Sequence, residues 1–449
     1  MGASMSQEVD QQIGQYYDPA LAAYVDAVGK RLVAAGEPTP YSFKFAIVDQ
    51  AEPNAFAAPG GYIYVSRGLI AQMNSEAELA GVLAHEISHV TRRHHTKQLG
   101  KQVSAGLFKL PCAAIGVINE DLGNMINAPI DTAGEVALAG YSRGQESEAD
   151  AYGMRRAAAA GYDPADLADA LQGIDRTILA LTGEQHEASY FDTHPTTPTR
   201  VADIEKQAAK LAWQPVAPLA DQAGLYQRLD GLWWGAENPQ QGVFQGQKFL
   251  SSDIRVSITF PPEWKTVNTP MFVGAAEPEG GAYIALGSGE RVEDPSELSE
   301  ALASKMYERA GIEPSERSTF RLGEWPASLV RYDDDSNEET VSLYYLFVSS
   351  PRETFTLMAM GLESYRDDLR ATAESLRQLT SQEAQSIQAL RVRVVERRPG
   401  ESLATFNQRV GNRWPGELTA AINGIDAQAP NDESQLIKIA RLERYTPAP

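Results

Sequence analysis

Cysteine, histidine and basic residues are scarce in this chain of 449 residues. Its single cysteine, Cys112, excludes an intrachain disulfide, and a cysteine count of one does not assign a compartment. The 39 Lys and Arg residues stand against 60 Asp and Glu residues, which gives a formal net charge of -21. This charge argues against partners that are polyanions, namely nucleic acids and anionic membrane surfaces.

A long apolar run is also missing. The longest one, residues 107–118, contains Lys109 and Pro111 and is too short to cross a bilayer, so we expect no transmembrane segment and interpret the run as a buried or surface-covering helix. No secretory signal is visible. We interpret the abrupt start as an expression remnant at the point where a signal sequence was cut away, although a natural cytoplasmic start would look the same.

The length predicts two or three domains, and the expected fold class is α+β. Residues 1–228 are expected to be mainly helical with a small sheet. Their periodicity predicts helices over 5–36, 75–99, 131–160, 163–181 and 197–211, a strand over 41–49 and a hairpin over 55–65. Ser75 and Glu78 have the spacing of a capping box and predict the start of the second helix.

The composition changes after residue 228. Residues 229–248 are rich in Gly, Gln and Asn and are interpreted as a linker or domain seam. Residues 249–381 contain six apparent strands and two helices, near 295–310 and 363–378, and are expected to form an α+β domain of unknown role. Residues 388–449 have the pattern of a strand, two short helices and a strand.

Four of the six histidines lie within residues 85–95, in the stretch LAHEISHVTRRHH. His85 and His89 are four residues apart, so on a helix they share one face and can present imidazoles to one zinc ion. Glu86 lies beside the first of them, where it can take a proton from a water molecule. The alternative is two satisfied histidines on an amphipathic helix. The apolar neighbours weigh against it, because buried polar groups need partners and a metal supplies one.

A catalytic zinc ion needs three protein ligands and one open position. No second histidine cluster follows, so the candidate for the third ligand lies in YSRGQESEADAYG, residues 141–153. Glu146 and Asp150 share one face of a predicted helix. Glu146 can ligate the metal and Asp150 can accept a hydrogen bond from a ligand imidazole. The alternative for this stretch is a solvated acidic face.

These motifs resemble those of the CaaX-prenyl-protease-like zinc metallopeptidases, of the HtpX/BepA type. The resemblance also includes a hairpin motif at residues 54–65, and Thr193, His194, Pro195 and Arg200 in a T-H-P-x-x-x-x-R segment. It covers roughly residues 5–211. It implies a zincin-like metallopeptidase domain that binds one zinc ion per chain and hydrolyses peptide bonds.

The expected absence of a transmembrane segment makes the chain similar to the soluble, periplasmic branch of this family, although it lacks a tetratricopeptide tail. We therefore expect a periplasmic or cell-envelope location, with the cytoplasm as the alternative, and polypeptide substrates. Residues 388–449 are faintly similar to a LysM module, and the alternative is a small α+β domain with another use. Besides its substrates, the protein is expected to bind a cell-wall glycan or an envelope protein through its C-terminal domains. Nucleic acid is not expected as a partner.

Each remaining candidate residue is compatible with more than one role. His194 or Arg200 can stabilise the oxyanion. The family also suggests that His194 is a fourth zinc ligand that holds the enzyme off. Without such a role, His194 is a turn histidine and Arg200 forms a surface salt bridge.

Asn54, Ala55 and Phe56 are expected at an edge strand that pairs with substrate, or in an ordinary hairpin. Two histidines beyond the zinc motif, His94 and His95, are interpreted as a solvated basic helix end. His186 lies in a polar loop and is interpreted as incidental.

Two hypotheses follow. The first is a zinc endopeptidase that acts on misfolded or misassembled cell-envelope proteins. The second is a binding or assembly factor that grips a partner through its C-terminal domains, with latent proteolysis, because more than 200 residues lie outside the catalytic unit. An intact Glu86 favours the first hypothesis, since a pure scaffold does not need a base there.

Overall fold

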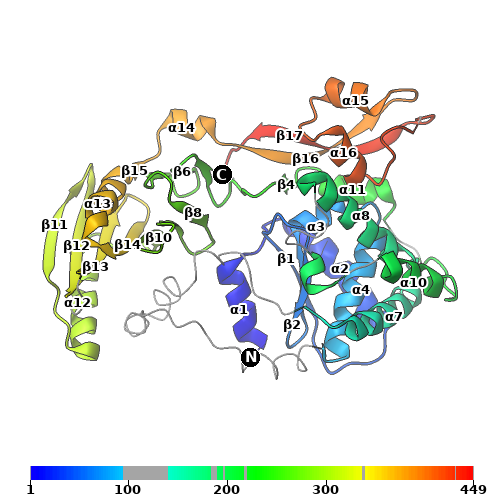
Figure 1. Ribbon diagram of the computed structural model, residues 1–449, viewed down its shortest axis with the longest axis horizontal. Helices are drawn as coiled ribbons and strands as arrows, with labels where there is room; N and C mark the ends of the chain where they lie inside the picture. Colours follow the sequence, from blue (N-terminus) through cyan, green and yellow to red (C-terminus); the bar gives the residue numbers. More distant parts are fainter. Residues whose placement is uncertain are drawn as a thin grey trace. The chain divides into compact units, whose positions relative to one another are not determined.

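The computed structural model describes residues 2–94, 140–183, 190–195, 198–216, 220–335, 339–429 and 431–447. The chain forms two compact units (Figure 1). The described residues of the first unit lie within 1–106, 137–236 and 389–443, and those of the second within 237–388 and 444–449. The apolar run at 107–118 and the expected start of a helix at 131 lie outside the described residues. No described helix has the length and apolarity needed to span a membrane.

The first unit is mainly helical. Its helices are α1 (Gly2–Gln12), α2 (Pro19–Ala35), α3 (Arg67–Gln72), α4 (Glu76–Thr91), α7 (Arg143–Ala159), α8 (Asp166–Thr182), α9 (Tyr190–Thr193), α10 (Pro198–Ala208), α11 (Gln222–Leu229), α15 (Leu403–Val410) and α16 (Gly416–Ile422). A small sheet has the order β1-β3-β2, from β1 (Lys44–Val48), β2 (Ala55–Ala58) and β3 (Tyr62–Ser66). β2 and β3 form the expected antiparallel hairpin, and β1 runs parallel to β3.

The single helix that was expected over residues 5–36 is wrong, because two helices occupy this segment. Asp18 ends the connection between them and caps α2: its carboxylate accepts hydrogen bonds from the backbone N–H groups of Ala20 and Leu21. Pro19 is the first residue of α2, a position where its missing N–H costs nothing. The Asp-Pro pair is thus a helix start that the apolar periodicity on both sides concealed.

Helix α4 is buried along almost its whole length. Ser75 caps it by accepting a hydrogen bond from the backbone N–H of Glu78, as the capping-box spacing predicted. From Leu79 to Val90 every side chain is buried. The helix packs against α2, α7, α8 and the small sheet (Figure 1). It is therefore the central element of the first unit.

The C-terminal elements belong to the same compact unit as α4. Strands β16 (Gln388–Arg397) and β17 (Gln435–Arg444) flank α15 and α16, and β16 also pairs with β4 (Trp233–Trp234). The ammonium group of Lys438, fully buried on β17, donates to the carbonyl oxygens of Ala71 at 3.0 Å and Met73 at 2.8 Å. Lys438 thereby ties β17 to the segment that leads into α4.

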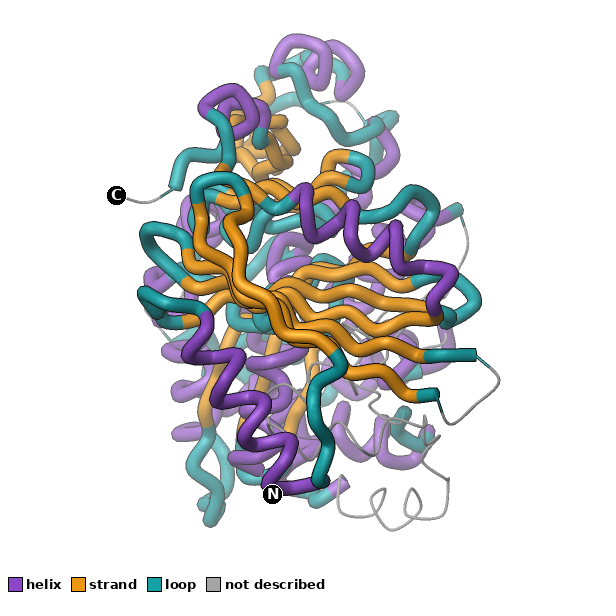
Figure 2. Tube along the Cα trace, turned by 90° about the vertical axis from the view of Figure 1, so that its left-hand side faces the viewer, coloured by secondary structure: helices purple, strands orange, loops and turns teal. Residues whose placement is uncertain are grey.

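The second unit contains two antiparallel sheets. One has the order β15-β7-β6-β5, from β5 (Val243–Gln245), β6 (Lys248–Ser251), β7 (Val256–Thr259) and β15 (Arg377–Gln378). The broad sheet has the order β11-β12-β13-β14-β10-β9-β8, from β8 (Lys265–Asn268), β9 (Val273–Ala276), β10 (Ala282–Gly289), β11 (Glu316–Leu322), β12 (Trp325–Asp334), β13 (Val341–Ser349) and β14 (Thr354–Leu362). Figure 2 shows these strands running side by side.

Helices cover the broad sheet because its central strands carry apolar residues on both faces. On β13, Tyr345 and Phe347 point toward α12 (Ser296–Ala310), whereas Leu346 and Val348 lie in the cluster that contains α13 (Arg366–Ser375). This alternation follows from the two-residue period of a strand. A 3-10 turn (Glu363–Tyr365) precedes α13, and α14 (Ser381–Ser386) follows it. The expected α+β class is confirmed.

The sequence analysis did not predict several of the strands. β11 is an edge strand with mostly exposed side chains on both faces, so it lacks an apolar pattern. The segment 229–248, which was interpreted as a linker or seam, contains β4 and β5. Both are too short for a periodic signal, and they form only because longer strands are present to pair with them.

Candidate metal centre

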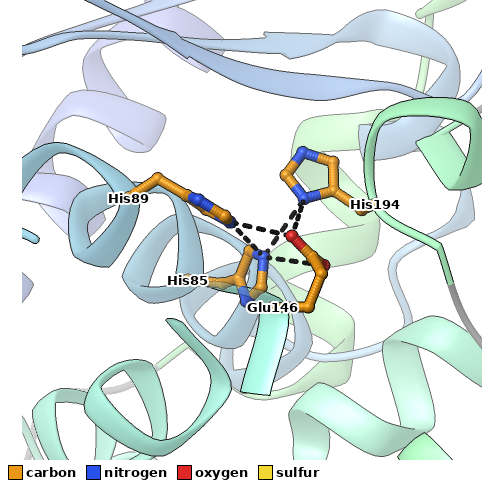
Figure 3. Close-up of side chains that lie close together, drawn as sticks. All are labelled: His85, His89, Glu146 and His194. Carbon is orange, nitrogen blue, oxygen red and sulfur yellow. Dashed lines mark hydrogen bonds and ion pairs between the residues drawn. The ribbon is translucent and has the colours of Figure 1, made fainter. Parts of the chain in front are cut away.

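Four side chains from three parts of the first unit point their ligand atoms at one place (Figure 3). His85 and His89 come from α4, Glu146 comes from the first turn of α7, and His194 follows α9. All four are buried, and one ligand atom from each lies within 4.8 Å of the others. The sequence predicted the first three as metal ligands, and the structure brings them together with His194.

Four of the distances between ligand atoms are close to those of a small tetrahedral site. His85 Nε2 lies 2.9 Å from His89 Nε2 and 3.2 Å from His194 Nδ1. Glu146 Oε1 lies 3.2 Å from His89 Nε2 and 3.3 Å from His194 Nδ1. Ligand bonds of about 2.0–2.2 Å in a tetrahedron separate the ligand atoms by roughly 3.3–3.6 Å.

The chemistry of these atoms also fits a cation. The Nε2 atom of His85 faces two other ring nitrogens, and one N–H group cannot satisfy both of them. A metal ion held by His85, His89, Glu146 and His194 satisfies all the converging lone pairs at once. The residues present therefore fit a divalent metal ion, and nitrogen and carboxylate ligands together suit zinc.

The N-terminal cap of helix α7 fixes where its acidic residues lie. Ser142 and Gln145 form a reciprocal capping box, so the first turn of the helix begins at Arg143 and carries Glu146. One turn later, Asp150 Oδ1 lies 2.9 Å from His85 Nδ1, on the ring edge that faces away from the ligand atoms. Asp150 is thus placed to orient the His85 ring, as the spacing of the two acidic residues indicated.

The guanidinium group of Arg200 contacts both acidic residues of α7 and the backbone of His194. It donates from Nε and Nη2 to both carboxylate oxygens of Asp150, at 2.9 and 2.8 Å, and from Nη1 to the carbonyl oxygen of His194 at 3.2 Å. Nη1 also lies 2.7 Å from Glu146 Oε2. Burial lowers the pKa of Arg200, but the bonds to Asp150 outweigh it and the net shift is upward. These contacts favour a salt bridge as the role of Arg200, although it lies in the interior and not at the surface.

The Glu86 carboxylate lies beside the candidate metal centre. Both of its carboxylate oxygens are buried, and neither has a hydrogen bond within the described parts of the chain. The nearest basic atom is His194 Nε2, 3.4 Å from Oε1. Burial raises the pKa of Glu86, because the charged form loses its hydration. A carboxylate in this environment can accept and return a proton.

Sequence reasoning missed two residues that contact His89. His94 Nδ1 lies 2.9 Å from His89 Nδ1, and the Tyr141 ring stacks on the His89 ring at a centroid distance of 3.7 Å. His94 is fully buried, so its interpretation as part of a solvated helix end is wrong. A continuous helix would point His94 elsewhere, but α4 ends at Thr91. His95 and His186 lie outside the described residues.

The candidate substrate strand lies at the edge of the small sheet. β2 contains Ala55 and Phe56 and packs against α4 and β3, and Asn54 immediately precedes it. Ala55 and Phe56 are buried, and the Phe56 ring stacks on Tyr64 of β3 at 5.0 Å. The Asn54 backbone N–H donates to Ser66 Oγ at 2.9 Å. The hairpin and the edge position are therefore both present.

Comparison with known proteins gives a family match that includes these residues. Residues 19–208 match the model of Peptidase family M48. A β-barrel assembly-enhancing protease of Yersinia pestis is 28% identical over 257 residues, 53% of this chain and 51% of that protein. A putative β-barrel assembly-enhancing protease of Vibrio cholerae is 33% identical over 221 residues, 45% of this chain and 42% of that protein. The matched stretch thus spans about half the length of these relatives.

A further relative is the metalloprotease LoiP of Escherichia coli, 29% identical over 189 residues, 42% of this chain and 69% of that protein. Among solved structures, a Bacteroides thetaiotaomicron protein aligns over 44% of this chain and 87% of its own, with 11% identity and a TM-score of 0.26, which is too low to show a shared fold. The family match covers the segment that supplies all four buried ligand candidates. Over residues 19–208, the chain is therefore similar to peptidase family M48.

Proposed function

We propose that this protein is a zinc-dependent endopeptidase that hydrolyses peptide bonds in misfolded or misassembled proteins of the cell envelope. The observation that carries the proposal is the pairing of a buried ligand set with the unbonded carboxylate of Glu86 beside it. The family match and the names of the relatives support the reaction type. The two relatives named for β-barrel assembly support envelope proteins as the substrate class and the periplasm or cell envelope as the location.

Each residue has a role in this proposal. His85, His89 and Glu146 would hold one zinc ion per chain, and the ion would supply Lewis acidity toward the scissile carbonyl and toward water. Glu86 takes the proton of the attacking water and passes it to the leaving amine. Asp150 orients His85. Arg200 holds Asp150 and the chain at His194 in place, so we assign it a positioning role.

We propose that His194 keeps the enzyme inactive in this conformation. Its Nδ1 atom lies with the ligand atoms of the other three residues, and a zinc ion bound by all four residues would have no open position. Tyr190 stacks on the His194 ring at 4.4 Å and Arg200 donates to its backbone carbonyl oxygen, so His194 is held through both its ring and its backbone. The alternative role is stabilisation of the oxyanion, which requires the ring to leave the ligand set.

The edge strand β2 is the proposed place for substrate. An extended peptide that pairs with an edge strand is held by backbone hydrogen bonds, which select little for sequence. Such recognition suits a protease that acts on unfolded chains of many sequences. We therefore place the substrate backbone beside Asn54, Ala55 and Phe56.

Casein zymography of the full chain tests the function, with the Glu86→Gln variant alongside and Glu205→Gln, an exposed carboxylate on α10, as the matched control. Each is made with His194 and with His194→Ala, so that a held-off wild type does not hide activity. We expect Glu86→Gln to keep zinc and its unfolding temperature but to lose hydrolysis by several orders of magnitude. Undiminished cleavage by Glu86→Gln contradicts the mechanism.

A second function is favoured by one observation: residues 237–388 form a compact unit outside the matched segment. The protein would then be an envelope binding or assembly factor with latent proteolysis. Its partner would be an envelope protein or, through the strand–helix–helix–strand order of the LysM-like segment 388–449, a cell-wall glycan. Cosedimentation of Glu86→Gln with purified cell-wall sacculi tests the glycan, and protein left wholly in the supernatant contradicts it.

A further inference from the structure

We propose that His94 and Glu148 are positioning residues for the metal ligand His89, which they hold through a chain of two hydrogen bonds. His94 Nδ1 lies 2.9 Å from His89 Nδ1, and His94 Nε2 lies 3.2 Å from Glu148 Oε2. Neither residue touches the ligand atoms, so both act through His89. The inference rests on the proposed function only in that the centre binds a metal ion.

When His89 binds a metal ion, only one arrangement of protons on the two rings allows both hydrogen bonds. His89 turns its Nε2 atom toward the other ligand atoms, so when it binds a metal as a neutral imidazole its proton is on Nδ1. His94 Nδ1 must then be the acceptor, which leaves the proton of His94 on Nε2. Glu148, an acceptor when ionised, receives that proton in a hydrogen bond. The tautomers of both rings are thereby set by the carboxylate.

The backbone folds back to make the contact. Helix α4 ends at Thr91, and Arg93 has a φ of 57°, a left-handed conformation that a residue with a side chain rarely adopts. The reversal brings the His94 ring under the last turn of the helix, where it is fully buried. Such a conformation persists when surrounding contacts hold it, and His89 and Glu148 supply contacts of this kind.

Glu148 is itself held at the far end. Arg92 donates from Nε to Glu148 Oε1 at 2.7 Å, and the side chain of Glu148 is 31% exposed. The two ligand histidines are thus oriented in the same way. Asp150 contacts His85 directly, and Glu148 contacts His89 through His94. Helix α7 therefore supplies one ligand, Glu146, and the outer carboxylates for both histidines.

The test is zinc affinity of the full chain, measured by competition with a fluorescent chelator, with no hydrolysis involved. The variants are His94→Leu, His94→Asn and Glu148→Ala, with Glu205→Ala as the control. Asn carries its Oδ1 atom on Cγ, as His carries Nδ1, so it keeps an acceptor for His89. We expect His94→Leu to weaken zinc binding about 10–100-fold, and His94→Asn to recover most of the loss. The visible spectrum of the cobalt-substituted protein should change in His94→Leu and resemble wild type in His94→Asn.

Three results overturn the inference. One is a His94→Leu variant with the zinc affinity and cobalt spectrum of wild type. The second is a His94→Asn variant as weak as His94→Leu, because a packing role would not distinguish an acceptor from a methyl group. If His94→Leu does not fold, Glu148→Ala decides, because it removes the acceptor for His94 Nε2 at a partly exposed position. Unchanged zinc affinity in Glu148→Ala, equal to that of the control Glu205→Ala, is the third.

The outcomes also separate this inference from the proposed function. A wild-type protein that binds no zinc overturns both. A protein that binds zinc with the predicted order of variants but cleaves no casein, even with His194→Ala, supports the positioning roles and contradicts the peptidase.

Discussion

Gly153 on α7 lies directly against the backbone of His85 on α4. A Cβ atom at residue 153 would be 3.0 Å from His85 N and 3.1 Å from His85 Cα, closer than side chains normally approach backbone. Because Glu146 and Asp150 stand on α7, the separation of the two helices decides how far these carboxylates lie from His85. The absence of a side chain at residue 153 is thus part of the geometry of the candidate metal centre.

Gly153→Ala should push α7 away from α4 by a few tenths of an ångström. We expect weaker zinc binding and a loss of about 1–3 kcal/mol in the free energy of unfolding, the usual cost of overpacking. Gly144→Ala on the same helix is the matched control, because a Cβ atom there meets nothing within 4 Å. It should be neutral or stabilising by up to about 1 kcal/mol. Urea unfolding with and without zinc measures both, and equal effects would show that the close approach does not matter.

Metal content should depend far more on Glu146 than on Glu148, although both stand on α7. Glu146 Oε1 is among the converging ligand atoms, whereas Glu148 contacts Arg92 and His94 outside them. We expect Glu146→Ala to lose zinc almost completely under a competing chelator, and Glu148→Ala to lose less. Full zinc in Glu146→Ala would show that the third ligand is another residue.

Replacement of His194 should raise activity. In this conformation its Nδ1 atom completes a ligand set of four, so His194→Ala opens the position that a catalytic zinc ion needs. Casein turnover at matched zinc content measures the effect. If His194 instead stabilises the oxyanion, turnover should fall by about a hundredfold. Equal turnover would mean that His194 is only a turn residue.

Asp166 should make the protein less stable as the pH rises from about 4 to about 6. Burial raises the pKa of Asp166 from 3.8 to about 6, with a further rise from Asp163 and Asp169. Between these values the folded chain binds a proton that the unfolded chain has released. The stability from this group is therefore full below about pH 4 and lost as the pH rises through about 6.

Urea unfolding of wild type and Asp166→Asn at pH 4 to 7 isolates this contribution, since other groups titrate in both proteins. The difference in unfolding free energy should shift in favour of Asp166→Asn as the pH rises. A difference that is constant with pH would contradict the prediction. Asn keeps an acceptor for Ser75 Oγ, which donates to Asp166 at 2.9 Å, so the cap of α4 is preserved.

Local rules were sufficient for the first half of the site. His85 and His89 share one face because α4 is a regular helix, and its start at Ser75 follows from a capping pattern of four residues. The same holds for Glu146 and Asp150 on α7 and for the β2–β3 hairpin. In each case the residues that decide the geometry lie within about one helical turn or one tight turn of one another.

The contacts of His94 and Arg200 could not be deduced in this way. His94 reaches His89 because the chain reverses at Arg93, and Glu148, 54 residues away, receives it. Arg200 reaches Asp150 across 50 residues. A sequence pattern reports which face of an element a residue occupies. It does not report which other element will cover that face.

The sequence by itself determined the elements and the chemistry they carry: a buried helix with two histidines and a glutamate, and a second helix with spaced carboxylates. Only the tertiary structure decided that Gly153 lies against the backbone of the first helix, that Lys438 joins β17 to the segment before α4, and that His194 lies beside the other three candidate ligands. The physical reason is the distance along the chain over which each kind of interaction acts. Helix and turn preferences act between neighbours in the chain, whereas these contacts arise from the packing of segments that are 48 to 367 residues apart.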